Sequence, residues 1–103
     1  MRDLQKRVAA FIREHHLETD PATRLLDLTS EVGELAKAYV ESTGYGASPF
    51  HPDDHWAEEL GDALFALIAL ALGTQVDLEE ALERVLRKYD HRVRTKGHAG
   101  SGA

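Results

Sequence analysis

The chain contains 103 residues with a formal net charge of −6, 43% hydrophobic residues, 29% charged residues and no cysteine. This length predicts a single domain, and the composition is that of a folded globular protein. The acidic balance argues against a nucleic-acid polymer as a partner, because binding a duplex requires a basic face. The lack of cysteine excludes a disulfide framework and thiolate chemistry.

The apolar runs of the sequence are too short for a membrane protein. The longest run, residues 63–72, falls far short of the roughly 20 residues that span a bilayer. Residues 1–7 lead directly into an amphipathic pattern and lack the apolar stretch and small-residue cleavage site of a signal peptide. We therefore expect a cytoplasmic protein that has no membrane partner.

The first half of the chain predicts two helices. Over residues 2–16, apolar side chains recur at three- and four-residue steps, which is typical of an amphipathic helix. Asp20 and Pro21 form a second helix start, an N-cap acceptor followed by a proline, and this helix extends to about Ser42. Residues 44–52 hold Tyr45, Phe50, two glycines and two prolines, and they predict a loop that either folds over a site or is a plain connector.

The second half of the chain predicts two further helices. The third begins near residue 53 or 54 and extends to about Leu72, before Gly73. The fourth begins after Asp77, which forms a capping box with Glu80, and ends near Gly97. We expect its apolar side chains to face inward: Leu78, Ala81, Leu82, Val85, Leu86 and Tyr89. Residues 1–97 should thus form one all-α, four-helix, bundle-like domain, and residues 98–103 should form a frayed tail.

The third predicted helix is apolar around its whole circumference over residues 63–72. Such a helix is expected to be buried on all sides. A short chain buries only a modest fraction of its surface, so it cannot easily cover this helix alone. We therefore expect a homodimer or a homotetramer in which helices of several copies complete the core.

The same helix carries acidic residues in its first half. Asp62 shares a helical stripe with Phe65 and Ala66, so its carboxylate is expected to point toward an interior. An isolated ionised carboxylate is very costly in a dry interior. Asp62 must therefore be protonated, paired with a cation or bound to a metal ion.

Two acidic pairs with a three-residue spacing lie on consecutive predicted helices, and each pair shares one helical face. A hairpin of the two helices brings the pairs together, and their oxygens suit Mg²⁺ or Mn²⁺, which substrate phosphates often share. The predicted metal ligands are Glu31, Glu34, Glu59 and Asp62. The alternatives are solvated helix faces, or ion pairs between the second acidic pair and arginines of the fourth helix.

Basic residues near these helices are candidates for binding phosphate. Lys37 follows Glu34 by about one turn, and Lys88 and Arg92 lie one turn apart on the fourth helix. The alternative role of Lys88 and Arg92 is to complement the helix dipole. The sequence has no Glu-x-x-His motif, which disfavours a di-iron bundle, and no Gly-x-x-x-x-Gly-Lys loop.

Four segments, in this order, resemble the MazG-type all-α nucleoside triphosphate pyrophosphohydrolases. They are residues 28–37 (LTSEVGELAK), 58–65 (EELGDALF), 77–81 (DLEEA) and 88–92 (KYDHR). The resemblance implies Mg²⁺-dependent hydrolysis of a nucleoside triphosphate to its monophosphate and pyrophosphate, by an oligomer with its site at the helix interface. This activity would serve to clean the nucleotide pool.

The resemblance also implies roles for individual residues. By motif position, the metal ligands are Glu31, Glu34, Glu59 and Asp62, and the residues at the phosphates are Lys88 and Arg92. Ser30 stands where the fuller motif has another glutamate, which leaves the number of metal ions open. We predict Glu31 and Glu34 as catalytic residues, with Glu31 orienting the water. The alternative is a non-catalytic helical oligomerisation or nucleotide-binding module.

Overall fold

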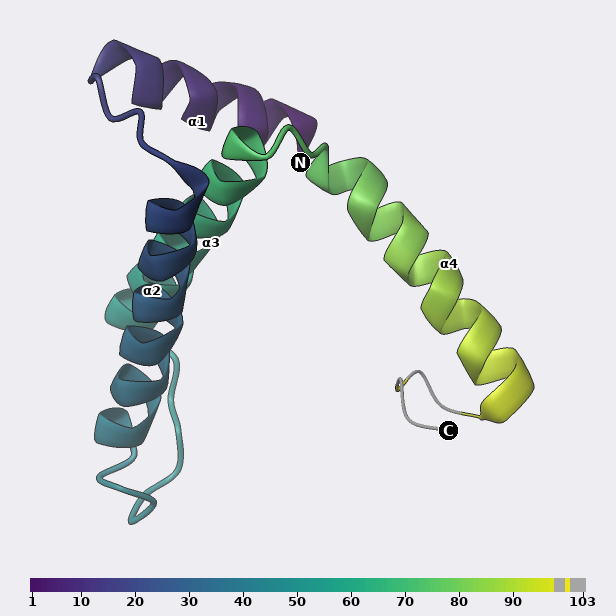
Figure 1. The fold of residues 1–103 in the computed structure, drawn as a ribbon. Helices are drawn as coiled ribbons and strands as arrows, with labels where there is room; N and C mark the ends of the chain where they lie inside the picture. The colour runs from purple at the N-terminus through teal and green to yellow at the C-terminus, as the bar shows by residue number, and fades with distance from the viewer. Residues whose placement is uncertain (98–99, 101–103) are drawn as a thin grey trace.

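The computed structural model of the chain describes residues 1–97 and Gly100, and it confirms an all-α fold. Its helices are α1 (Arg2–Glu14), α2 (Pro21–Ser42), α3 (Asp54–Gly73) and α4 (Leu78–Lys96) (Figure 1). The predicted tail at residues 98–103 lies outside the described residues, apart from Gly100. None of these helices is by itself long and apolar enough to cross a membrane. Taken together, α3 and α4 have the length and composition of a membrane span, but they are bent by 102° at the break between them.

Three of the helices begin with a capping aspartate, which the sequence predicts for Asp20 and Asp77. Asp20, Asp53 and Asp77 each accept a hydrogen bond from the backbone N–H three residues later, at 2.7, 2.8 and 3.1 Å. These bonds satisfy N–H groups that have no partner within the helix. By contrast, α1 ends at Glu14, two residues before the predicted end, and His16 adopts a left-handed φ of 55°.

The hairpin of α2 and α3 is the main helix–helix contact of the chain (Figure 1). The buried apolar side chains are few and centre on α3: Ile12, Ala66, Ile68, Ala69 and Ala71. Ile68 is only 1% exposed, and the alanines around it are small enough for neighbouring helices to approach closely. This contact sets how the acidic residues of α2 and α3 face one another.

Aromatic packing anchors the loop that joins α2 to α3. The ring of Phe50 stacks on Tyr39 with centroids 4.5 Å apart and meets Trp56 edge-on at 5.0 Å. Tyr45, the other aromatic residue of the loop, is 80% exposed. The loop is therefore a connector that Phe50 holds against the hairpin.

Gln5 and Arg2 fasten α1 to the beginning of α4. The buried Gln5 side chain donates through Nε2 to the carbonyl oxygen of Val76 and accepts from the N–H of Leu78, both at 2.8 Å. Arg2 forms ion pairs with Asp77 and Glu79, each at 2.8 Å. No periodicity or motif in the sequence indicated this role for Gln5.

Beyond this attachment, α4 leaves the hairpin at 102° to α3 (Figure 1). The radius of gyration of 16.8 Å exceeds the roughly 13 Å of a compact domain of this length. The prediction that α4 turns its apolar side chains inward is wrong in one chain for Leu82, Leu86 and Tyr89, which are exposed. The other three predicted side chains are half-buried: Leu78, Ala81 and Val85. The prediction that α3 is buried on all sides is also wrong in one chain, because Leu64 and Leu67 are exposed.

Asp77 provides a test of this attachment. The hydrogen bond from Arg2 lowers the pKa of Asp77, so its contribution to stability is present above the ordinary pKa of an aspartate and is lost as pH falls through the lowered value. We expect Asp77→Ala to lower Tm by about 2–8 °C at pH 7, and Asp77→Asn, which keeps the cap, to lower it less. The Asp77→Asn effect should shrink toward pH 3. Circular dichroism melts measure both, and an unchanged Tm for Asp77→Ala would contradict the role of this contact.

Candidate metal centre

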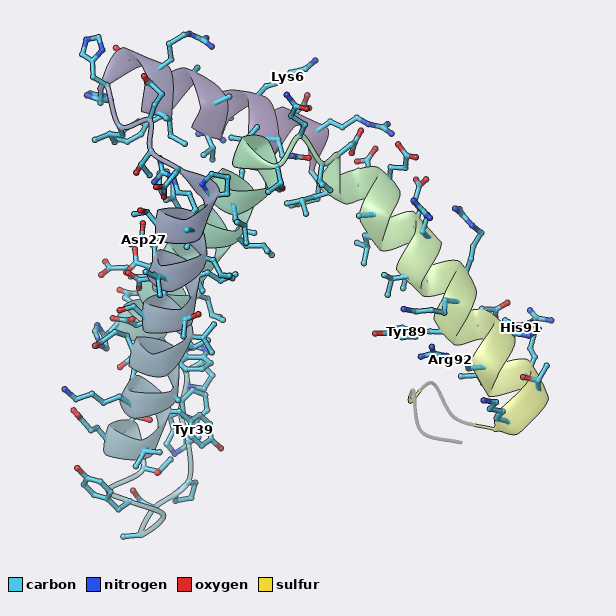
Figure 2. The ribbon with its side chains drawn as sticks, in the orientation of Figure 1. Lys6, Asp27, Tyr39, Tyr89, His91 and Arg92 are labelled. Atoms are coloured by element: carbon cyan, nitrogen blue, oxygen red, sulfur yellow. The ribbon has the colours of Figure 1, made fainter. Side chains whose placement is uncertain are left out.

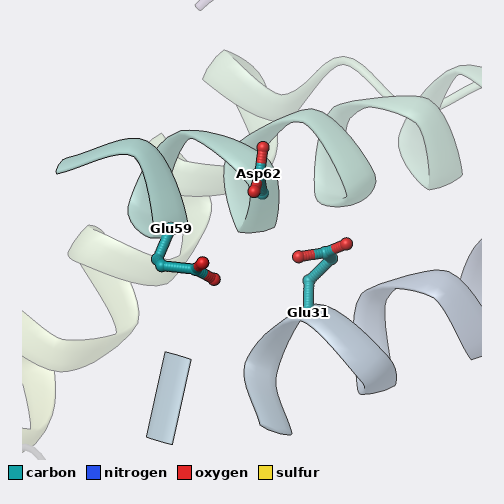
Figure 3. A group of neighbouring side chains, drawn as sticks. All are labelled: Glu31, Glu59 and Asp62. Carbon is teal, nitrogen blue, oxygen red and sulfur yellow. The ribbon is translucent and has the colours of Figure 1, made fainter. Parts of the chain in front are cut away.

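Carboxylates from two helices meet at the α2–α3 contact. Glu31 projects from α2 toward Glu59 and Asp62, which lie one turn apart on α3 (Figure 3). One oxygen of each side chain lies within 4.8 Å of the others. The structure thus brings together three of the four predicted metal ligands.

The electrostatics of this trio suit a divalent cation. Partial burial raises the pKa of Glu31, and the negative charges of Asp62 and Glu59 raise it further. Around one octahedral Mg²⁺, neighbouring ligand oxygens lie about 3.0 Å apart and opposite ones about 4.2 Å apart, so binding a single ion would draw the three carboxylates closer by up to about 2 Å. Hard oxygen donors that repel one another at this distance fit such an ion, whose charge relieves their repulsion.

The remaining acidic candidate, Glu34, lies outside the trio. It is exposed on α2, one turn after Glu31, and its charge contributes to the raised pKa of Glu31. Asp62 is itself exposed, so the prediction that its carboxylate points toward an interior is wrong for one chain. Glu59 lies 3.7 Å from Nε2 of His55 on its own helix. Within the described part of one chain, neither Glu59 nor Asp62 forms an ion pair with an arginine of α4, as the alternative interpretation required.

The predicted phosphate-binding residues are not gathered at the trio in one chain. Lys37 is exposed on α2 with its Nζ 3.8 Å from Glu41. Nζ of Lys88 and Cζ of Arg92 lie over the Tyr89 ring of α4, at 5.5 and 5.9 Å from its centroid. Figure 2 shows Tyr89 and Arg92 on the part of α4 that extends away from α2.

A cavity of about 210 Å³ opens beside the carboxylates. It is lined by Arg24, Asp27, Glu31, Asp62, Phe65 and Ala66. Arg24 and Phe65 were not among the predicted site residues. The helical period could have indicated both, because Arg24 precedes Glu31 by two turns on one face of α2 and Phe65 follows Asp62 by about one turn.

Comparison with known proteins identifies the family of this fold and site. The profile of the MazG nucleotide pyrophosphohydrolase domain matches residues 19–96. The chain belongs to this family. The match confirms the resemblance of the four sequence segments and identifies the chain as an enzyme, a nucleotide pyrophosphohydrolase.

The relatives include a bacterial protein of similar length. The chain is 36% identical to the uncharacterised protein YpjD of Bacillus subtilis, over 89% of this chain and 85% of YpjD. A crystal structure of YpjD superimposes with a TM-score of 0.73 at 35% identity, covering 85% of this chain and 92% of that one. The chain is also 36% identical to dCTP pyrophosphatase 1 of Mus musculus, but it spans only 63% of that longer protein.

Substitution of Glu31 tests whether the trio binds a cation. We expect Mg²⁺ to raise the Tm of the wild type, because a ligand that binds only the native state stabilises it, by about 2.7 kcal/mol at 100 times Kd. Glu31→Gln should lose most of this shift and should itself melt higher than the wild type without metal, because it removes a repelled charge.

The pH dependence and a matched variant complete this test. A raised pKa means that the destabilising charge of Glu31 develops as pH rises from the ordinary value through the raised one. The metal-free difference between Glu31→Gln and the wild type should therefore be larger at pH 7 than at pH 4. Glu14→Gln, the same charge change at the exposed end of α1, should behave like the wild type. A full Mg²⁺ shift in Glu31→Gln would show that the trio is not the metal centre.

Proposed function

We propose that this enzyme hydrolyses a nucleoside or deoxynucleoside triphosphate to the monophosphate and pyrophosphate, with Mg²⁺ as its cofactor and Mn²⁺ as a substitute. The observation that carries the proposal is the meeting of Glu31, Glu59 and Asp62 beside a cavity, on a fold of this family. In the proposed site Glu34 joins these three as a ligand. Such an activity fits a cytoplasmic enzyme, formed by residues 1–97 as one domain, that removes unwanted nucleotides.

The proposed reaction is an attack of water on the α-phosphorus. A new bond forms between the water oxygen and this phosphorus, the bond to the oxygen bridging to the β-phosphate breaks, and pyrophosphate leaves. Mg²⁺ held by Glu31, Glu34, Glu59 and Asp62 would polarise phosphoryl oxygens and make a water more acidic. Glu31 orients the attacking water and accepts its proton, a role favoured by the raised pKa of this carboxyl. The remaining requirement is to position and neutralise the phosphates.

We further propose that the enzyme works as a homodimer or homotetramer. On α4, the exposed side chains of Leu82, Leu86, Tyr89 and Val93 follow the four–three–four spacing of a helix that packs along another helix. Leu86 is 55% exposed in the single chain, and contiguous apolar surface of this kind marks a protein interface.

The hairpin has matching apolar surface. Leu25, Val32 and Tyr39 are exposed on α2 at seven-residue intervals, and Leu60, Leu64 and Leu67 are exposed on α3. A second copy that covers these stripes with its α4 would also bring Lys88 and Arg92 toward the acidic centre. In that arrangement, Lys88 and Arg92 of one copy could bind phosphate at the acidic trio of the other copy.

A nucleotide panel tests the proposed reaction. We expect monophosphate and pyrophosphate as products in the presence of Mg²⁺, and dCTP is included because mammalian relatives are dCTP pyrophosphatases. Glu34→Ala and Asp62→Ala should each lower kcat by about 100-fold or more. Ion-exchange separation of the products decides between the outcomes. Diphosphate and phosphate as products would contradict the proposal, and nucleotide binding without Mg²⁺ dependence or turnover would favour a non-catalytic module.

Light scattering coupled to size exclusion tests the assembly. We expect a mass of two or four chains for the wild type and a shift toward one chain for Leu86→Glu, because the substitution places a charge in an apolar interface. Arg87→Glu changes charge at the neighbouring exposed position outside this stripe and should leave the mass unchanged. A wild-type monomer at micromolar concentration would contradict the proposed assembly.

A further inference from the structure

Arg24 places a positive charge at the cavity beside the acidic centre. The cavity has two acidic walls, formed by Asp27 and Glu31 of α2 and by Asp62 of α3. Among the described residues that line it, Arg24 is the one cation. An arginine in this position has either a structural role or a role toward an anionic ligand.

The contacts of Arg24 leave most of its hydrogen-bonding capacity unused. Its Nη2 donates to the backbone carbonyl oxygen of Leu17, which holds the side chain against the connector between α1 and α2. Within the described part of the chain, no carboxylate lies within ion-pair distance of this guanidinium, although Asp27 and Glu31 share the same cavity. A guanidinium has five N–H donors in a planar fork that matches phosphate oxygens, so several donors remain for a ligand.

The position of Arg24 along α2 indicates which part of a nucleotide it meets. Seven residues separate Arg24 from Glu31, which corresponds to about 10 Å along the helix axis. The cavity of about 210 Å³ is smaller than the roughly 300 Å³ or more of a pocket that encloses a whole small-molecule ligand. It therefore has room for one end of a nucleotide, and its cation selects the anionic end.

We infer that Arg24 binds the β- and γ-phosphates of the substrate, the group that leaves as pyrophosphate. This inference rests on the proposed function, in which the α-phosphate reacts at Glu31, Glu59 and Asp62. The cavity then receives the two outer phosphates on the α2 N-terminal side of these carboxylates. Arg24 thereby determines that the enzyme prefers triphosphates to monophosphates.

Calorimetric titration with inorganic pyrophosphate in Mg²⁺ tests this role without requiring turnover. We expect Arg24→Gln to weaken pyrophosphate binding by about 10-fold or more, since charge-assisted hydrogen bonds are lost, and to change nucleoside monophosphate binding by less than threefold. Arg24→Lys keeps the charge without the fork and should weaken pyrophosphate binding by about threefold or more. In turnover, KM for the triphosphate should rise more than kcat falls.

Controls separate this role from support of the connector. Arg13→Gln makes the same charge change at an exposed position of α1 and should bind pyrophosphate like the wild type. A purely structural Arg24 would lower Tm and leave the ratio of pyrophosphate to monophosphate affinity unchanged, and that result would overturn the inference. If Arg24→Gln does not fold, the same ratio measured for Arg24→Lys decides.

The two proposals fail separately. A wild type that hydrolyses triphosphates but whose pyrophosphate affinity is insensitive to Arg24 overturns the inference alone. A wild type that does not bind pyrophosphate in Mg²⁺ also overturns it. A wild type without turnover, in which Arg24→Gln selectively weakens pyrophosphate binding, refutes the proposed reaction and retains Arg24 as a pyrophosphate-binding residue.

Discussion

Repulsion between carboxylates held together by the packing of α2 against α3 is the constraint on which this site depends. Glu31 comes from one helix and Glu59 and Asp62 from the other, and the helix contact holds their oxygens within 4.8 Å of one another. Partial burial raises the pKa of Glu31, and the negative charges of Asp62 and Glu59 raise it further. Binding of a divalent cation, as proposed here, would relieve this repulsion.

The open shape of the chain leaves the apolar face of α4 uncovered. Most helical proteins of this size bury one continuous core, whereas here the buried side chains centre on α3 and α4 stands apart. Gln5 and Arg2 hold the beginning of α4 in place through hydrogen bonds and ion pairs, so its direction is defined even though its apolar face is uncovered. A helix fixed in direction and exposed along one stripe is well suited to receive a second copy.

The cavity beside the acidic centre is electrically asymmetric. Arg24, Glu31 and Asp62 all line it, and Glu31 and Asp62 also belong to the acidic trio. A nucleoside triphosphate has a matching asymmetry once a cation neutralises its reacting phosphate, since its outer phosphates remain anionic. Phe65 provides an apolar part of the same wall and also meets Phe11 of α1 edge-on at 6.1 Å, so α1 supports the cavity from behind.

The helices, their starts and the acidic motifs were predictable because they depend on local rules. Capping by Asp20, Asp53 and Asp77 uses atoms within three residues, and the three-residue spacing of Glu59 and Asp62 places them on one face of any helix. The match of the MazG profile to residues 19–96 confirms the family resemblance that was based on the four sequence segments.

What local rules do not contain is how one helix lies against another. The direction of α4, the exposure of Leu82 and Leu86, the bridge made by Gln5 and the place of Arg24 at the cavity all depend on contacts between residues distant in the chain. An apolar stripe shows that a helix must be covered, but it does not show which neighbour covers it, because the hydrophobic effect is non-directional. The sequence by itself therefore determined the helices and the acidic motifs, and the tertiary structure alone decided which charges meet and which apolar faces remain uncovered.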